Sequence, residues 1–248
     1  MVAGTSSFTT SANNATITLT NTGNALNGAI ALSTGAGTAD ASLTNNVATT
    51  LAASSIGRNL TVTDSVGNLT QSGVLTVGGT SSFTTSASNA TITLNSANLL
   101  TGAASLTTSG ANGNASLTNA KATVLGASNV GGNLTMTDTV GNLTQNAALT
   151  VAGTSSFTTS ANNATITLTN AGNALSGAIA LSTTGATADA SLTNNVATTL
   201  AASSIGRNLT VTDSVGNLTQ SGVLTVAGRP RSPRRPRTRP SHSIAPTC

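Results

Sequence analysis

The chain has 248 residues, of which 38% are hydrophobic, 1% aromatic and only 6% charged. So few charged and aromatic residues are unlike a globular enzyme and suit a narrow core of small side chains. The formal net charge of +4 does not indicate a nucleic-acid partner, because residues 1–228 carry three basic residues against five aspartates. The remaining six arginines all lie after residue 228. We therefore expect no nucleic-acid partner for the body of the chain.

One segment of the chain occurs three times. Asn59–Thr76 (NLTVTDSVGNLTQSGVLT) returns with few changes at Asn133–Thr150 and unchanged at Asn208–Thr225. These copies belong to three tandem units, residues 2–76, 77–150 and 151–225, and a fourth unit starts at Val226. A fixed period of this length predicts one supersecondary unit stacked on itself, as in solenoid proteins.

Within each unit, apolar side chains alternate with hydroxyl or small side chains in short segments. In the first unit we expect strands at residues 16–19, 30–32, 60–63 and 75–77, separated by turns such as Thr22–Asn24 and Asp64–Asn68. Alternation places one set of side chains on each face of a strand, and Thr, Val and Ile suit a pleated surface. Residues 48–57 (ATTLAASSIG) are the one ambiguous stretch, and no long helix is predicted.

These features predict an all-β fold for residues 1–228, a right-handed parallel β-helix (β-solenoid). Leu, Val, Ile and Ala would fill the interior, and Thr, Ser and Asn would cover the outside. Each unit would hold either three coils of about 25 residues or four coils of about 19, and both numbers fit the spacing. With three coils per unit, the stack would rise about 43 Å at a strand spacing of about 4.8 Å.

Both ends of the chain are expected to be cuts in a longer repeat array. Met1 occupies the position that a threonine holds before the other units, so the chain begins inside a repeat. At the other end, RPRSPRRPRTRPSHSIAPTC (residues 229–248) stands where the fourth unit should continue with TSSFTT. We predict that this basic tail is disordered.

The genetic code offers an origin for the tail. Synonymous codons for Thr80–Leu99, read one base later, reproduce all 20 tail residues and then a stop codon. We therefore interpret residues 229–248 as an out-of-frame translation of the fourth repeat, so that His242 and Cys248 are neither ligand nor nucleophile. The alternative is a genuine basic tail, in which Arg229–Arg239 contact an anionic partner.

Three aspartates, Asp64, Asp138 and Asp213, recur in the motif TD[ST]VGN and could suggest a calcium site or catalytic acids. Asp at the start of such a motif is favoured in turns, and one Asp per unit does not form the cluster that either role needs. The chain also has no Glu for glycoside hydrolysis, no His before residue 229 for a Ser-His-Asp triad, and no strand–GxGxxG–helix context. We predict no enzyme activity and no catalytic, cofactor-binding or metal-binding residue.

Two further patterns have both a functional and a structural reading. Thr-x-Thr pairs such as Thr16/Thr18 and Thr61/Thr63 resemble the arrays of ice-binding β-helices, but we expect segments without Thr, such as residues 28–32, to interrupt them. Asn-x-Ser/Thr triplets could accept glycans, but we interpret them as turn residues that precede strands. The triplets start at Asn14, Asn59, Asn68, Asn89, Asn114, Asn133, Asn142, Asn163, Asn208 and Asn217.

Residues 67–94 (GNLTQSGVLTVGGTSSFTTSASNATITL) and their copies resemble the repeats of filamentous-haemagglutinin-like bacterial adhesins and related β-strand-repeat surface proteins. The resemblance covers residues 1–228. It implies a secreted fibre or stalk at the cell surface that attaches to a host or surface ligand, and it supplies no cofactor or binding residue.

Two features of the sequence bear on the cell-surface location that this resemblance implies. The start of the chain lacks a signal-peptide pattern, so export of this chain itself is not predicted, and no run of 18 apolar residues predicts a membrane span. The alternative function is a self-associating S-layer-like or matrix fibre. Uncapped solenoid ends would favour such self-association.

Overall fold

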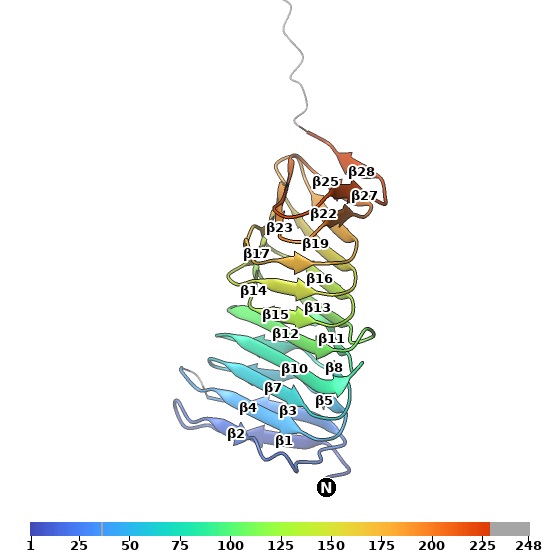
Figure 1. Cartoon of the computed structure of the whole chain (residues 1–248). Helices are drawn as coiled ribbons and strands as arrows, with labels where there is room; N and C mark the ends of the chain where they lie inside the picture. The colour runs from blue at the N-terminus through green and yellow to red at the C-terminus, as the bar shows by residue number, and fades with distance from the viewer. Residues whose placement is uncertain (36, 229–248) are drawn as a thin grey trace, which may run out of the picture.

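The computed structural model describes residues 1–35 and 37–228, which form a β-solenoid with no helix among them (Figure 1). Every strand pairing is parallel. The predicted all-β parallel solenoid is therefore confirmed, and the right-handed winding stays a prediction. The predicted disordered tail and its out-of-frame origin concern residues 229–248, which lie outside the described residues.

The strands form two sheets, which we name sheet 1 and sheet 2. Sheet 1 contains β1 (Ser6–Thr9), β3 (Ala29–Ser33), β5 (Thr49–Leu51), β6 (Ser54–Ile56), β8 (Leu69–Gln71), β9 (Leu75–Val77), β11 (Ile92–Leu100), β13 (Ala115–Asn119), β16 (Leu134–Asp138), β19 (Ser155–Asn162), β22 (Ile179–Thr184), β24 (Thr198–Leu200), β25 (Ser203–Ile205), β27 (Leu218–Gln220) and β28 (Leu224–Val226). Sheet 2 contains β2 (Ile17–Leu19), β4 (Ala41–Asn45), β7 (Leu60–Asp64), β10 (Ser81–Ser88), β12 (Ala103–Ser109), β14 (Thr123–Leu125), β15 (Ser128–Val130), β17 (Leu143–Gln145), β18 (Leu149–Val151), β20 (Ile166–Leu168), β21 (Ala174–Leu175), β23 (Ala190–Asn194) and β26 (Leu209–Asp213).

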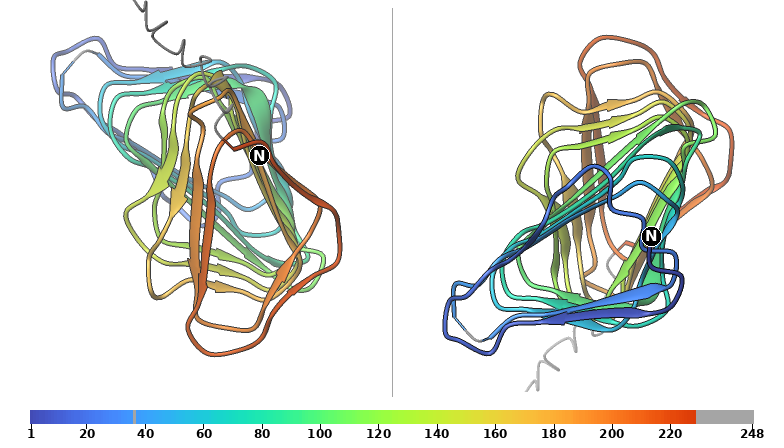
Figure 2. Two further views of the ribbon diagram at one scale, coloured as in Figure 1. Left: turned by 90° about the horizontal axis from the view of Figure 1, so that it is seen from above. Right: turned by 90° about the horizontal axis from the view of Figure 1, so that it is seen from below.

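The chain passes from one sheet to the other in each coil, and the coils stack along one axis (Figure 1). Ten steps of pairing lead from β1 to β27 in sheet 1, so the stack has about ten turns. At about 4.8 Å per step the stack rises about 48 Å. Viewed along the axis, the coils are flattened, and their long dimension rotates steadily from the first coil to the last (Figure 2). The two faces of the solenoid are therefore twisted surfaces.

Each unit makes three and a half turns, so the prediction of three or four whole coils was wrong. The motif SSFTT starts β1 in sheet 1, β10 in sheet 2 and β19 in sheet 1 again. Seven steps of pairing join β1 to β19 while the chain advances 149 residues from Ser6 to Ser155, or about 21 residues per turn. A strand with alternating side chains can join either sheet, so a repeat need not close on a whole turn. Equivalent residues of successive units consequently lie on opposite faces.

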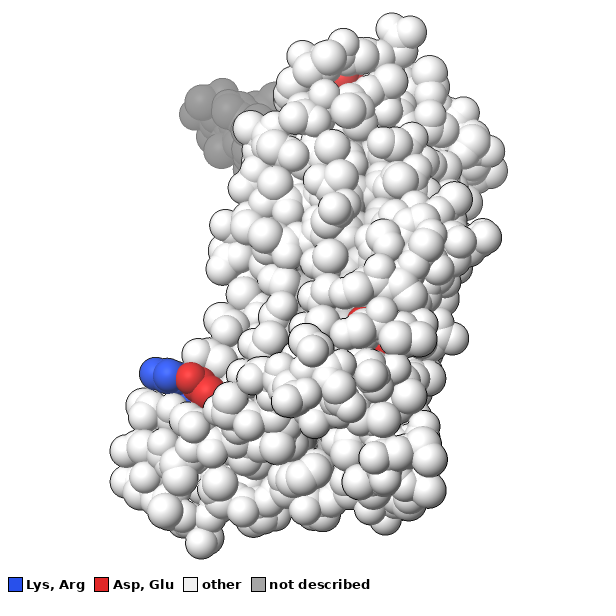
Figure 3. All heavy atoms as spheres, turned by 60° about the horizontal axis from the view of Figure 1, so that its bottom comes forward, with Lys and Arg blue, Asp and Glu red and all other residues white. Residues whose placement is uncertain are grey.

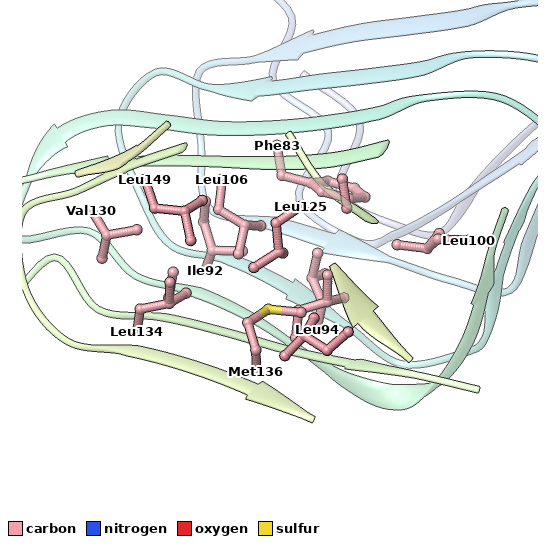
Figure 4. Packing of buried hydrophobic residues seen from close by; sticks show 14 of the residues in the cluster. Phe83, Ile92, Leu94, Leu100, Leu106, Leu125, Val130, Leu134, Met136 and Leu149 are labelled. Carbon is pink, nitrogen blue, oxygen red and sulfur yellow. The ribbon is translucent and has the colours of Figure 1, made fainter. Parts of the chain in front are cut away.

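The core is a narrow layer of apolar side chains between the two sheets. It follows the predicted alternation: in β7, Leu60 and Val62 are buried while Thr61 is exposed. Phe83 and Phe157 are fully buried, and Phe8 in the first coil is partly buried. Figure 4 shows Phe83, Met136 and Leu106 among the side chains that fill the middle coils. These apolar side chains are large enough to fill the core because the two sheets are separated by a single layer of side chains.

The ambiguous stretch of the sequence is extended. Residues 48–57 form β5 and β6 with a short break between them, and their copies in the later units form β14 with β15 and β24 with β25. Ala52 N–H donates to Ile30 O of the preceding coil at 2.8 Å. Pairing with neighbouring coils therefore holds this alanine-rich stretch in strands, although alanine has a low intrinsic preference for strands.

Candidate functional surface

Outward-facing hydroxyl groups form ordered columns on both faces, because equivalent strands stack in register. On sheet 2, Thr44 pairs with Thr63, and Thr63 pairs with Thr84 in the next coil. We name the two neighbouring columns there the sheet 2 array. Its members are Ser42, Thr44, Thr61, Thr63, Ser82, Thr84, Ser105 and Thr107. All eight are half-buried or exposed.

The half-turn of the repeat places a second array on the opposite face. We name it the sheet 1 array, and its members are Ser116, Thr118, Thr135, Thr137, Ser156, Thr158 and Ser182. Thr118 pairs with Thr137, and Thr137 pairs with Thr158, as their copies do on sheet 2. One chain therefore presents two chemically similar surfaces that point in opposite directions.

The prediction that segments without Thr interrupt the hydroxyl rows is confirmed on sheet 1, where Ala31 pairs with Ser7 and its copy Ala180 pairs with Ser156. Residues 28–32 lie on sheet 1, whereas Thr16/Thr18 and the array above them lie on sheet 2. The segment therefore does not interrupt the sheet 2 array. The ice-binding reading gains little from this, because the rotation of the coils twists both arrays out of a flat plane (Figure 2).

A shallow depression of about 300 Å³ accompanies the sheet 1 array. Hydroxyl and amide side chains dominate its polar lining, and no aromatic side chain takes part. Its polar residues are Thr91, Thr93, Asn114, Ser116, Asn133 and Thr135. Such groups can donate and accept hydrogen bonds with a sugar or a hydrated surface, and each contact would be weak.

The surface carries little charge. Figure 3 shows a face on which Lys, Arg, Asp and Glu atoms occur in only a few places. Arg58 pairs with Asp40 of the preceding coil, and Arg207 pairs with Asp189 in the same way. The guanidinium of Arg58 donates to Asp40 through Nε at 2.7 Å and lowers the pKa of that carboxyl. These pairs fasten neighbouring coils and leave few free charges.

The recurring aspartates are structural, as the sequence predicted for turn residues. Asp64 is fully buried; its Oδ1 accepts from the N–H groups of Val66 at 3.0 Å and Gly67 at 2.5 Å. Its Oδ2 accepts from the Thr49 hydroxyl at 2.6 Å. Asp138 makes the same contacts one unit later. In the last coil, the Gly216 N–H donates to Asp213 at 2.6 Å and lowers the pKa of that carboxyl.

Sequence reasoning missed a set of buried amide side chains that line up above one another. Asn45 pairs in register with Asp64; its Oδ1 accepts from Leu26 N–H at 2.9 Å and its Nδ2 donates to Leu26 O at 3.1 Å. Between the first and second units, the amides of Gln71 and Asn98 exchange hydrogen bonds of 2.9 and 3.0 Å. The sequence did contain a signal for these amides. Asn45 is the last residue of the alternating segment ASLTN, in the position that Asp64 holds in LTVTD.

These amides and the recurring aspartates form three sets that we name the polar ladders; the second and the third each begin with a glutamine of the preceding unit. The ladders are Asn24–Asn45–Asp64, then Gln71–Asn98–Asn119–Asp138, then Gln145–Asn173–Asn194–Asp213. Each buried amide satisfies backbone groups where the chain turns between the sheets, where no ladder of strand hydrogen bonds can do so. The half-turn moves successive ladders to opposite edges of the solenoid.

The asparagines of the Asn-x-Ser/Thr triplets act between coils. The Oδ1 of Asn59 accepts from Thr80 N–H of the next coil at 2.9 Å, and Asn68 does the same for Thr91 at 2.8 Å. Asn14 and Asn89 adopt positive φ values of 61° and 65°, which Asn tolerates better than most residues. The prediction of a turn role is therefore confirmed for these positions, and glycosylation stays untested.

Among the described residues, no group of three or more His, Cys, Asp or Glu side chains is placed to hold a metal ion. The same part of the chain holds no helix that is long and apolar enough to span a membrane. His242 and Cys248, which were predicted to be neither ligand nor nucleophile, and the basic run Arg229–Arg239 fall outside the described residues. The candidate functional surface therefore consists of the two arrays and the depression beside one of them.

Fold and surface together define a class, a parallel β-solenoid built from tandem repeats with polar outer faces. A family described as "Repeats of unknown function (DUF5649)" matches residues 1–33, 38–107, 112–182 and 187–231. These segments cover most of the chain, so the chain belongs to this family. No curated protein and no solved structure shows a significant match to the chain.

Proposed function

We propose that the chain is a structural and adhesive repeat segment of a large secreted bacterial surface adhesin, acting as a stiff stalk or a multivalent attachment surface. The observation that carries the proposal is the pair of hydroxyl arrays, which recur every three and a half turns on opposite faces. The resemblance of residues 67–94 to adhesin repeats supports the cell-surface setting.

The physical argument rests on rigidity and number. Polar ladders and parallel pairing tie every coil to its neighbours, so the arrays keep fixed spacing along the axis. A unit of three and a half turns advances about 17 Å, and each advance presents the same hydroxyl groups on the other face. Many weak hydrogen-bonded contacts at fixed spacing add through avidity when the ligand is also repetitive, as a polysaccharide or a matrix fibre is.

The test compares binding of the whole chain to immobilised host glycans, matrix proteins and albumin. Replacing Thr44, Thr63 and Thr84 with Ala removes three of the four hydroxyl groups in one column of the sheet 2 array, and replacing Thr118, Thr137 and Thr158 does the same in the equivalent column of the sheet 1 array. We expect either triple variant to bind more weakly than the native chain and the combined variant to lose binding. The matched control replaces three exposed threonines outside the arrays, Thr20, Thr101 and Thr169. If the control loses as much binding as the array variants, or the native chain binds no more than albumin does, the attachment role is wrong.

The second candidate is a self-associating S-layer-like or matrix fibre. The exposed apolar side chains of the last coil favour it: Leu218 is 50% and Val223 is 74% exposed. In this case the native chain would associate with itself at concentrations where it binds none of the surfaces above.

A further inference from the structure

The last described coil exposes side chains that its identical copy buries. We name residues 208–226 the C-terminal coil; it contains β26, β27 and β28, each at the edge of its sheet. Leu218 is 50% exposed and Val226 is 43% exposed, whereas their counterparts Leu69 and Val77 are 0% and 1% exposed. Among the described residues, nothing stacks on this coil. It therefore exposes the same residues that form one side of the coil-to-coil interface inside the chain.

The other half of the same interface lies at the opposite end of the molecule. We name residues 4–24 the N-terminal coil; it contains β1 and β2. Their copies in the second unit stack on copies of the C-terminal coil: β10 pairs with β7, placing Phe83 against Val62, and β11 pairs with β8, placing Ile92 against Leu69. The third unit repeats both pairings, of β19 with β16 and of β20 with β17.

We propose that a second copy of this chain stacks its N-terminal coil on the C-terminal coil of the first, in the register that joins the units within the chain. β1 of the second copy would pair with β26 of the first, so Phe8 would cover Val211, and Ile17 would cover Leu218. Because β1 belongs to sheet 1 and β26 to sheet 2, the second copy is turned by half a turn about the axis. The contact is head-to-tail and leaves both outer ends free, so it extends into a filament. The inference does not depend on the adhesive role proposed above.

Backbone and asparagine groups at the two ends complement one another. In the interior, Leu60 N–H donates to Thr80 O at 2.9 Å while Asn59 Oδ1 accepts from Thr80 N–H at 2.9 Å. The third unit repeats both contacts between Leu134, Asn133 and Thr154. At the junction, Leu209 and Asn208 of the first copy would take the places of Leu60 and Asn59. Thr5 of the second copy would take the place of Thr80. The C=O and the N–H of Thr5 would thus each make one hydrogen bond with the first copy.

A polar ladder would also be completed at the junction. Gln71 exchanges hydrogen bonds with Asn98, and Gln145 exchanges hydrogen bonds of 2.8 and 2.9 Å with Asn173. The next ladder starts with Gln220, whose amide donates only to Gly222 O at 3.5 Å within the described residues. Asn24, the counterpart of Asn98, has no glutamine beneath it in its own chain. Stacking would place Asn24 of the second copy on Gln220.

The glycine at position 4 fits the same contact. A Cβ added at its copies would lie 2.5 Å from Asn59 Oδ1 for Gly79 and 2.4 Å from Asn133 Oδ1 for Gly153. A Cβ added at Gly4 would meet nothing within 4 Å. A side chain at position 4 would therefore clash only if a coil like the C-terminal coil lay against it. In the proposed junction, that side chain would approach Asn208.

Cysteine crosslinking of the whole chain tests the register. Inside the chain, Ser82 pairs with Thr61 and Ser156 pairs with Thr135, so the junction should pair Ser7 with Thr210. One variant carries Ser7→Cys and the other Thr210→Cys, both with Cys248→Ser to remove the one native thiol. Adjacent parallel strands bring paired Cα atoms within disulfide range. We expect mild oxidation of the mixture to yield a covalent dimer.

The matched control shifts the register by two residues. Mixing the Ser7→Cys variant with a Thr212→Cys variant separates the thiols along the strand by about 7 Å, beyond the reach of a disulfide. We expect several-fold less dimer from this mixture. Equal yields from the two mixtures, or no dimer from either, would overturn the proposal.

A second variant tests the same contact without thiols. Gly4→Val should leave the circular dichroism spectrum unchanged, because its side chain meets open space within the chain, and should reduce the fraction of assembled protein in sedimentation velocity several-fold. The matched control is Val66→Lys, at a turn tip that is 61% exposed and follows β7, two pairing steps from the N-terminal coil and outside the proposed junction. Assembly that tolerates Gly4→Val but not Val66→Lys would show that the chain associates through its sides and not its ends.

Discussion

Asn59–Thr76 and Asn208–Thr225 have the same sequence but different surroundings. The first copy has coils on both sides, and β7 shows the burial pattern of a core strand. The second copy has a described coil on one side only, and the same residues of β26 are half-buried or exposed. Local sequence thus sets the strands, the turns and the side-chain alternation, since these are alike in both copies. Burial comes from the neighbouring coil.

The comparison shows why solenoid stability is a property of interfaces. Each coil is too thin to bury its apolar side chains alone, so most of its stability comes from the two neighbours. Val66 and Val215, at the tips of equivalent turns, are 61% and 75% exposed, a small difference. Leu69 and Leu218, between the sheets, differ far more. Substitutions at equivalent positions should separate the energy of stacking from that of local structure.

The largest effect is expected for leucine truncation. Leu69→Ala removes a fully buried side chain and leaves a cavity between coils, which should reduce the free energy of unfolding by about 3 kcal/mol. Leu218→Ala should cost about 1 kcal/mol, because half of that side chain is already exposed. Urea unfolding followed by circular dichroism measures both. Equal losses would mean that something outside the described residues covers the last coil.

The second effect concerns the buried carboxylate. Asp64→Ala leaves the N–H groups of Val66 and Gly67 and the hydroxyl of Thr49 without their acceptor, and should cost about 2–3 kcal/mol. Asp213→Ala should cost less, because its turn is open to water, which can replace the lost acceptor. The measurement is again urea unfolding. A larger loss for Asp213 than for Asp64 would contradict the structural role assigned to these aspartates.

The sequence predicted much of this architecture and missed the part that depends on stacking. Period-two alternation and turn residues sufficed to predict parallel coils, a core of small apolar residues and the turn role of Asp64. The number of turns per unit was mispredicted, because no residue marks which sheet a strand joins. The polar ladders and the stacking of Thr pairs into arrays were missed for the same reason: Thr44 and Thr63 meet only once the coil length is known.

A third expected effect is the difference in backbone protection between the two copies. Leu60 N–H donates to Thr80 O inside the stack, whereas Leu209 N–H belongs to the edge strand β26. The residues that flank Leu60 and Leu209 are identical, so the intrinsic exchange rates of the two amides match closely. We expect the Leu209 amide to exchange orders of magnitude faster, since edge strands open locally more easily. The two segments form peptides of equal mass, so residue-resolved NMR is the suitable measurement.

Concentration sharpens this third prediction. If chains stack end to end, the Leu209 amide gains an acceptor, and its protection should rise with protein concentration while that of Leu60 stays constant. The Gly4→Val variant supplies the control, because its Leu209 amide should remain unprotected at every concentration. Protection at Leu209 that is already high in dilute solution would instead place a cap over the C-terminal coil.

The smallest effect concerns the ion pair of Asp40 with Arg58, for which the second unit is a natural comparison. There, Asn114 and Gly132 replace the pair, and Asn114 Oδ1 still accepts from Asn133 N–H at 2.7 Å, as Asp40 does from Asn59 N–H at 2.9 Å. Asp40→Asn should therefore keep the coil-to-coil hydrogen bond and lose only a solvent-exposed ion pair. We expect a barely measurable loss of stability at neutral pH.

The pH dependence of that loss distinguishes the ion pair from the hydrogen bond. Arg58 holds the pKa of Asp40 below its usual value, so the folded state binds the proton less readily than the unfolded state does. The pair's contribution is present above the unfolded pKa of about 3.9 and disappears as the pH falls through the lower folded value. The native chain and Asp40→Asn should therefore converge in stability once the pH falls below the lowered folded pKa of Asp40. A difference that persists in acid would mean that the asparagine disturbs the coil itself, and that the hydrogen bond from Asn59 is not conserved between the two units.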